Sequence, residues 1–155
     1  MESIMSFIND LKNAIDNYET DNCNTQILSY SLIGAGQTVL NVGDRFRFKV
    51  KVTNQSHLDM VNVRVRIVGS SHASLEFPPF WWETAQVNTP AFSLPAHQTY
   101  TTGYYYGRAK VVTSGVEQIV TARINSWDAS LHHLLYDHTG YGAKEGKLNK
   151  QVYAD

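Results

Sequence analysis

The pattern of apolar and polar residues changes its period once along the chain, and this change separates one helix from a set of strands. Near the N-terminus, apolar residues recur every three or four positions, which is the spacing of one side of a helix. They are Ile4, Phe7, Ile8, Leu11, Ile15 and Tyr18. The polar run TDNCN, residues 20–24, interrupts the pattern. Residues 1–22 are therefore predicted to form one amphipathic helix.

Two later segments alternate strictly between apolar and polar residues, as strands with one buried and one solvated face do. In residues 45–52, phenylalanine and valine alternate with arginine and lysine, and in residues 61–67, valine and isoleucine alternate with asparagine and arginine. Weaker strand patterns cover residues 26–33, 38–42, 73–77, 87–92, 100–112 and 116–127. Many short strands between glycine and polar turns indicate antiparallel sheets packed face to face. The predicted fold is all-β, an immunoglobulin-like antiparallel β-sandwich.

The predicted organisation is one domain flanked by two terminal segments. A chain of 155 residues is long enough for a single core. The sandwich is expected over residues 26–137, after the helix of residues 1–22. Residues 138–155 contain three glycines and little apolar periodicity, so we expect a C-terminal arm that has no core of its own.

Composition narrows the class of protein and its compartment. Charged residues make up 17% and the net charge is −1, which excludes a chain disordered by charge and a bulk attraction to nucleic acid. Cys23 is the only cysteine, so no intrachain disulfide forms, as is typical of a reducing compartment. No signal-peptide pattern and no membrane-spanning run is present. We expect a cytoplasmic protein, with release by lysis or a non-classical route as the alternative.

Residues 43–69, GDRFRFKVKVTNQSHLDMVNVRVRIVG, carry a resemblance to a known family. They resemble the first half of bacterial immunoglobulin-like domains of the CARDB and related adhesion-type families. FSLPAHQTYTTGYYYGRA and SGVEQIVTARINSW look like the later half, so the resemblance covers roughly residues 26–127. It implies a sandwich fold and a role as an adhesion, spacer or assembly module, and implies no particular ligand.

Candidate catalytic and metal-binding groups are few. Cys23 lies in the polar run after the helix, and no short motif places a base beside it. His133 and Asp137 stand four apart, so a helix would present both to one metal ion, but a zinc site needs about four ligands. We therefore predict no enzyme activity, no cofactor and no metal, with a metal-dependent hydrolase as the most distant alternative.

Basic residues gather on the polar side of the two alternating segments: Arg45, Arg47, Lys49, Lys51, Arg64 and Arg66. Like charges would face each other if the two strands were neighbours in one sheet, at a cost of about 0.2–1 kcal/mol per pair. Placing the strands in opposite sheets avoids this. Each stripe is then either a solvated face or a docking surface. The acidic N-terminal segment, with five acids and one lysine in residues 1–22, raises the case for docking.

Aromatic residues are concentrated in FPPFWWET, residues 77–84, and in GYYYG, residues 103–107. Trp81 and Trp82 are adjacent, so in an extended chain their rings point to opposite sides. The rings are interpreted as core cover, as a subunit interface, or as a stacking platform for sugars or single-stranded nucleic acid.

The predicted function is that of a non-catalytic structural or interaction protein that assembles with itself into an oligomer or filament, with other proteins as further partners and without nucleic acid or membrane. The predicted interface comprises Phe7, Leu11, Ile15, Phe80, Trp81, Trp82, Arg47, Lys49, Arg64 and Arg66. The alternative is a carbohydrate-binding module whose platform comprises Trp81, Trp82, Tyr104, Tyr105 and Tyr106.

Overall fold

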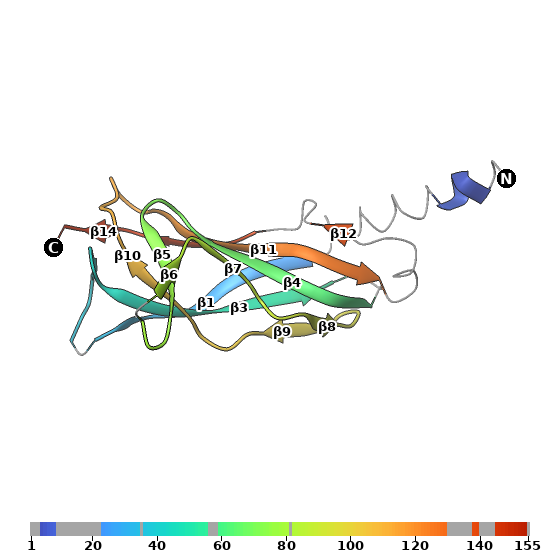
Figure 1. Ribbon diagram of the computed structural model, residues 1–155, viewed down its shortest axis with the longest axis horizontal. Coiled ribbons are helices and arrows are strands. Elements are labelled where there is room, and N and C mark those ends of the chain that lie inside the picture. Colours follow the sequence, from blue (N-terminus) through green and yellow to red (C-terminus); the bar gives the residue numbers. More distant parts are fainter. Residues whose placement is uncertain are drawn as a thin grey trace.

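A computed structural model describes residues 4–8, 23–34, 36–55, 59–80, 82–129, 138–139 and 145–154 (Figure 1). Residues 4–8 are helical, in agreement with the start of the predicted helix. Leu11 and Ile15 lie outside the described residues. Nearly all other regular structure is β-strand, arranged as an antiparallel sandwich.

Two large sheets make up the sandwich. The first sheet has the strand order β1 (Cys23–Ile33), β3 (Arg45–Asn54), β10 (Tyr105–Ala109), β5 (Ala73–Phe77) and β6 (Trp82–Thr84), with β9 (Thr99–Thr101) also paired to β3. The second has the order β12 (His138–Thr139), β11 (Glu117–Ala129), β4 (Met60–Gly69) and β7 (Gln86–Asn88), with β13 (Gly146–Lys150) on β11 and β8 (Phe92–Leu94) on β4. A small parallel pair joins β2 (Leu40–Asn41) to β14 (Val152–Tyr153).

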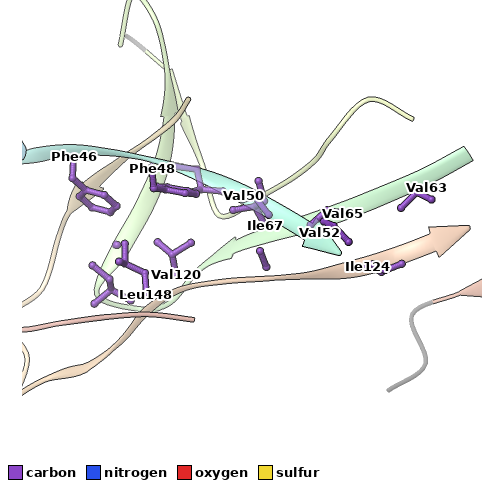
Figure 2. Packing of buried hydrophobic residues seen from close by; sticks show 14 of the residues in the cluster. Phe46, Phe48, Val50, Val52, Val63, Val65, Ile67, Val120, Ile124 and Leu148 are labelled. Atoms are coloured by element: carbon purple, nitrogen blue, oxygen red, sulfur yellow. The ribbon is translucent and has the colours of Figure 1, made fainter. Parts of the chain in front are cut away.

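The core lies between the two sheets and confirms the alternation of residues 45–52 and, from Val63 onward, that of residues 61–67. At the start of β4 the register shifts, so that Met60 is buried in place of Val61. The inward-facing apolar side chains of β3 and β4 are buried and meet Val120 and Ile124 of β11 and Leu148 of β13 (Figure 2). On β3 and β4 they are Phe46, Phe48, Val50, Val52, Val63, Val65 and Ile67. Burial of each such side chain is worth about 1.5–3 kcal/mol, which is why a period of two fixes these strands so firmly.

The two basic stripes lie on opposite outer faces, because β3 belongs to the first sheet and β4 to the second. The arginines and lysines of one stripe therefore never oppose those of the other. Like charges do meet elsewhere: Arg45 is paired with Arg108 on β10, and Arg66 with Arg123 on β11. These pairings follow from strand register, which the sequence pattern of single strands does not reveal.

Two predicted strands are each divided in the structure. Residues 87–92 contribute to both β7 and β8, and residues 100–112 contribute to β9 and β10. Two buried threonines lie where these segments leave regular pairing, and a third lies in the connection before β11. Each exchanges two hydrogen bonds of 2.9–3.2 Å with a valine. The N–H of the threonine donates to the carbonyl of the valine, and the N–H of the valine donates to the hydroxyl oxygen of the threonine, which replaces a backbone carbonyl as acceptor. The pairs are Thr89 with Val65, Thr102 with Val50, and Thr113 with Val152.

The expectation of a C-terminal arm without a core is wrong for β13 and β14. β13 is antiparallel to β11 and buries Gly146 and Leu148, whereas β14 pairs with β2 and buries Val152. A side chain at position 146 would approach the Thr25–Gln26 backbone of β1 to about 3 Å, so this glycine lets β13 lie close to β1. The alternation here is only a few residues long and begins with a glycine, which is why the pattern was weak.

Candidate binding face

The outer side of the first sheet collects cationic and aromatic side chains into what we call the basic-aromatic face. It is defined by Arg45, Arg47, Lys49, Phe80, Tyr104, Tyr106 and Arg108. Strands β3 and β10 place these residues in rows, because Tyr106 is the direct neighbour of Arg47 and Arg108 that of Arg45. Residues paired in this way project from the same side of a sheet.

Tyr104 organises the two cations at the middle of β3. The guanidinium carbon of Arg47 lies 4.2 Å from the centre of the Tyr104 ring, and the Nζ of Lys49 lies 4.7 Å from it. Such contacts stabilise by about 0.5–1 kcal/mol at exposed sites. Arg47 is held further by its Nε, which donates a hydrogen bond to the hydroxyl of Ser31 at 3.0 Å. Its guanidinium is therefore positioned before any partner arrives.

Phe80 forms the second aromatic part of the face, at the end of the turn that follows β5. Its N–H donates to the carbonyl of Phe77 at 2.7 Å, and its φ of 75° is unusual for a residue with a side chain. The ring lies edge-on to Tyr106 with centres 5.3 Å apart, and the guanidinium carbon of Arg45 is 4.8 Å from its centre. A backbone held in this region costs of order 1–3 kcal/mol, so surrounding contacts must fix it.

A cavity of about 480 Å³ opens between Phe80 and the end of β1. Its lining combines apolar side chains with one cation: Leu32, Ile33, Gly34, Arg47, Pro78, Phe80 and Tyr106. A hollow with this lining suits an apolar side chain of a partner that also has a negatively charged group close by.

Glu76 balances the two arginines that oppose each other across β3 and β10. Its side chain is 2% exposed, and its Oε2 accepts a hydrogen bond from the Nε of Arg45 at 2.7 Å. Its Oε1 lies 3.1 Å from the Nε of Arg108. A carboxylate between two guanidinium groups removes the repulsion that their pairing would otherwise cause. Glu76 is thus a structural residue beneath the face.

Glu83 neutralises a further cation at the edge of the sheet. It accepts hydrogen bonds from Ser74 at 2.9 Å and from Lys110 at 3.1 Å, and these bonds lower the pKa of its carboxyl group. Among the described residues, Arg47 and Lys49 form no ion pair. Arg47 and Lys49 are therefore the cations of the basic-aromatic face whose charge no described carboxylate neutralises.

The three consecutive tyrosines do not share one surface. Tyr105 points toward the core and stacks on Phe48 at 6.3 Å, and burial raises the pKa of its hydroxyl. Trp82 is 58% exposed on the edge strand β6 and packs on Phe77 with ring centres 5.1 Å apart. Trp81 lies outside the described residues. The structure therefore does not unite Tyr104, Tyr105 and Tyr106 in the flat platform expected for sugar stacking.

The predicted interface residues are likewise divided. Arg47, Lys49 and Phe80 come together on the basic-aromatic face. Arg64 and Arg66 lie on β4, on the outer side of the opposite sheet. Sequence reasoning found the cations of β3 and named Tyr106 only as part of the alternative ligand platform. It missed Arg108 and Glu76, whose roles depend on pairing between β3, β10 and β5.

Cys23 and the pair His133 and Asp137 are the remaining candidates for catalysis or metal binding. Cys23 is buried, with its Sγ 3.4 Å from the sulfur of Met60. His133 and Asp137 lie outside the described residues. Within the described ranges, no three residues of the His, Cys, Asp and Glu types are grouped to hold a metal ion. Over the same ranges, no helix has the length and apolar character needed to cross a membrane.

Solved structures that are distantly similar to this chain include Spo0M and SoR45. The chain aligns with Spo0M, a sporulation control protein from Bacillus subtilis, at 10% identity and a TM-score of 0.43, over 86% of this chain and 50% of that protein. It aligns with the structural-genomics target SoR45 at 6% identity and a TM-score of 0.42, over 86% and 88% of the two chains. No family model and no curated protein matches. The relationship to CARDB-type families stays a prediction.

Proposed function

We propose that the chain is a non-catalytic interaction protein that assembles with further copies of itself. The observation that carries this proposal is the exposure of apolar side chains on the N-terminal helix. Ile4, Met5 and Phe7 are 60%, 52% and 67% exposed. Covering such side chains is worth about 1.5–3 kcal/mol each when burial is complete. A second copy of the chain supplies the cover.

The distribution of charged residues also supports a second copy of the chain as the partner. Residues 1–22 contain Glu2, Asp10, Asp16, Glu19 and Asp21 against Lys12 alone, a balance of 1 − 5 = −4. The basic-aromatic face offers Arg47 and Lys49, both already held over Tyr104. Side chains fixed before binding lose less conformational entropy on association. Attraction between opposite charges also speeds encounter and sets orientation.

The test is the mass of the full-length protein in solution over a range of concentrations, by light scattering. We expect species larger than the monomer, with weaker assembly at high salt because salt screens exposed charges. The double variant R47E/K49E should assemble less well, whereas R64E makes the same kind of charge change on the opposite sheet and should assemble as the wild type does. A wild-type protein that stays monomeric at every concentration would overturn the proposal.

The carbohydrate-binding alternative is favoured by the exposure of Trp82 alone. A glycan screen on the same samples separates the two functions. Glycan binding by a monomeric protein, lost in Trp82→Ala, would favour that alternative and reject assembly.

A further inference from the structure

Some of the exposed apolar side chains outside the helix lie beside partly buried ones at one place, which we call the apolar tip. It is defined by Tyr30, Leu32, Val39, Val116 and Tyr153, and these residues line a cavity of about 340 Å³ together with Lys150 and other neighbours. Val116 is 70% exposed, and Val39 and Tyr153 are also exposed. Three separate parts of the chain thus contribute apolar side chains to one concave surface.

The tip is a built surface and not a set of loose loops. Its rim is the parallel pair of β2 and β14, extended by a hydrogen bond of 3.0 Å from the N–H of Val42 to the carbonyl of Tyr153. Below the rim, Thr113 and Val152 exchange two hydrogen bonds, which tie the connection before β11 to the C-terminal strand. The cavity is therefore largely preformed, as binding sites usually are.

The apolar helix and the apolar tip lie at opposite ends of the long axis of the molecule. Figure 1 shows the N-terminal helix at one end and β14 with the C-terminus at the other. β1 connects the two regions, since it begins at Cys23, just after the N-terminal segment, and reaches the tip through Leu32. Eleven residues of strand span roughly 35 Å at about 3.3 Å per residue. Each molecule therefore has an uncovered apolar helix at one end and an uncovered apolar hollow at the other.

Charge at the tip matches the helix. Lys150 is the charged residue in the lining of the cavity, and its Nζ lies 4.1 Å from the centre of the Tyr30 ring. The N-terminal segment that would approach it has a balance of −4. The negative charge of this segment would be attracted to the ammonium group at the edge of the hollow, where partial burial strengthens the attraction.

We propose that the apolar tip binds the N-terminal helix of a second copy, so that copies join head to tail. This inference rests on the proposed self-assembly and names its contact. The two surfaces differ, so every bound copy leaves a free tip or a free helix for the next. Contacts of this kind produce rings where the rotation closes and filaments where it does not.

The decisive experiment mixes two full-length variants that each lack one surface. In the helix variant, I4E/F7E, the apolar side of the helix is charged while the tip is intact. In the tip variant, V116E, a carboxylate stands at the hollow and repels the acidic segment while the helix is intact. Val116 is exposed in the monomer, so the substitution should leave the fold unchanged, as circular dichroism would verify. Val111→Glu is the matched control, since Val111 is also exposed and does not line the cavity.

We expect each variant alone to need a protein concentration at least about tenfold higher than the wild type for assembly, a change of 1.4 kcal/mol or more. An equimolar mixture should form dimers and nothing larger, because the intact helix of one variant fits the intact tip of the other. Val111→Glu should assemble as the wild type does.

Each contrary result overturns a different statement. A monomeric wild type rejects self-assembly and the tip contact together. A wild type that assembles while V116E assembles equally well rejects the tip as the acceptor and leaves self-assembly standing. Two variants that stay monomeric when mixed reject the head-to-tail arrangement.

Discussion

The ring of Phe46 on β3 lies directly over Gly107, its paired neighbour on β10. Phe46 is fully buried and belongs to the core. A methyl group at position 107 would overlap the ring atoms. Gly107, the second glycine of GYYYG, is therefore required by packing in the core, although its neighbours Tyr106 and Arg108 contribute to the outer face.

Gly107→Ala should lower the free energy of unfolding by about 1–3 kcal/mol, the usual cost of adding a methyl group to a filled core. Denaturant titration followed by fluorescence measures it. Gly103→Ala is the control, because no atom lies within 4 Å of the position of its added methyl group. Equal losses in the two variants would contradict the packing of Phe46 on Gly107.

Removing the charge of Glu76 should leave the repulsion between Arg45 and Arg108 without compensation. Glu76→Gln is expected to cost about 1.5–3 kcal/mol, the range for buried hydrogen bonds to charged groups. Glu83→Gln removes a carboxylate from an exposed pair with Lys110 and should cost under about 1 kcal/mol. The comparison is made by thermal and denaturant unfolding. A neutral Glu76→Gln would show that the arginines are satisfied without it.

The hydroxyl of Thr102 should stabilise the junction between β9 and β10. Thr102→Val keeps the shape but leaves the buried N–H of Val50 without its acceptor, which costs about 1–3 kcal/mol. Thr102→Ser retains the hydroxyl and should lose less. Thr101→Val changes an exposed neighbour on β9 and should be close to neutral. Denaturation of the three variants ranks them, and a harmless Thr102→Val would reject this role.

Burial and, to a lesser extent, the charge of Asp44 raise the pKa of Tyr30 from its usual value of about 10 to about 12. The neutral phenol is favoured in the folded state, so its contribution to stability is complete below about pH 10 and is lost as pH rises toward 12. Ultraviolet absorbance should show a tyrosine that ionises near pH 12. Tyr30→Phe should remove that step and weaken the alkaline loss of stability. A wild type whose tyrosines all ionise near pH 10 would contradict the burial of this group.

The fold could be predicted wherever one strand carried its own pattern. The alternation of residues 45–52 places Phe48 in the core and Arg47 outside from sequence alone, because the side-chain period of a strand is two. β13 was missed because Gly146 contributes no side chain to the pattern and is buried for a reason that lies in β1. Local periodicity has no access to such contacts.

The basic-aromatic face could likewise be predicted only in part. Arg47 and Lys49 were identified from β3, but their organisation by Tyr104 depends on a residue more than fifty positions away. Glu76 gave no signal, since a single glutamate in a short strand is normally solvated. Residues grouped by register between distant strands become visible only when the pairing is known.

β1 is a long strand at the border of the first sheet, and such borders tend to recruit strands from other molecules. Here the pairing with β3 shifts register between Leu28 and Ser31, and Ser29 has a φ of 57°. Gly146 allows β13 to lie against the beginning of the same strand. The bulge in β1 and the neighbouring strand β13 together disfavour edge-to-edge pairing of β1 with a strand of another molecule. Polymers built by the proposed head-to-tail contact would then remain reversible and dissolve on dilution, in contrast to cross-β aggregates.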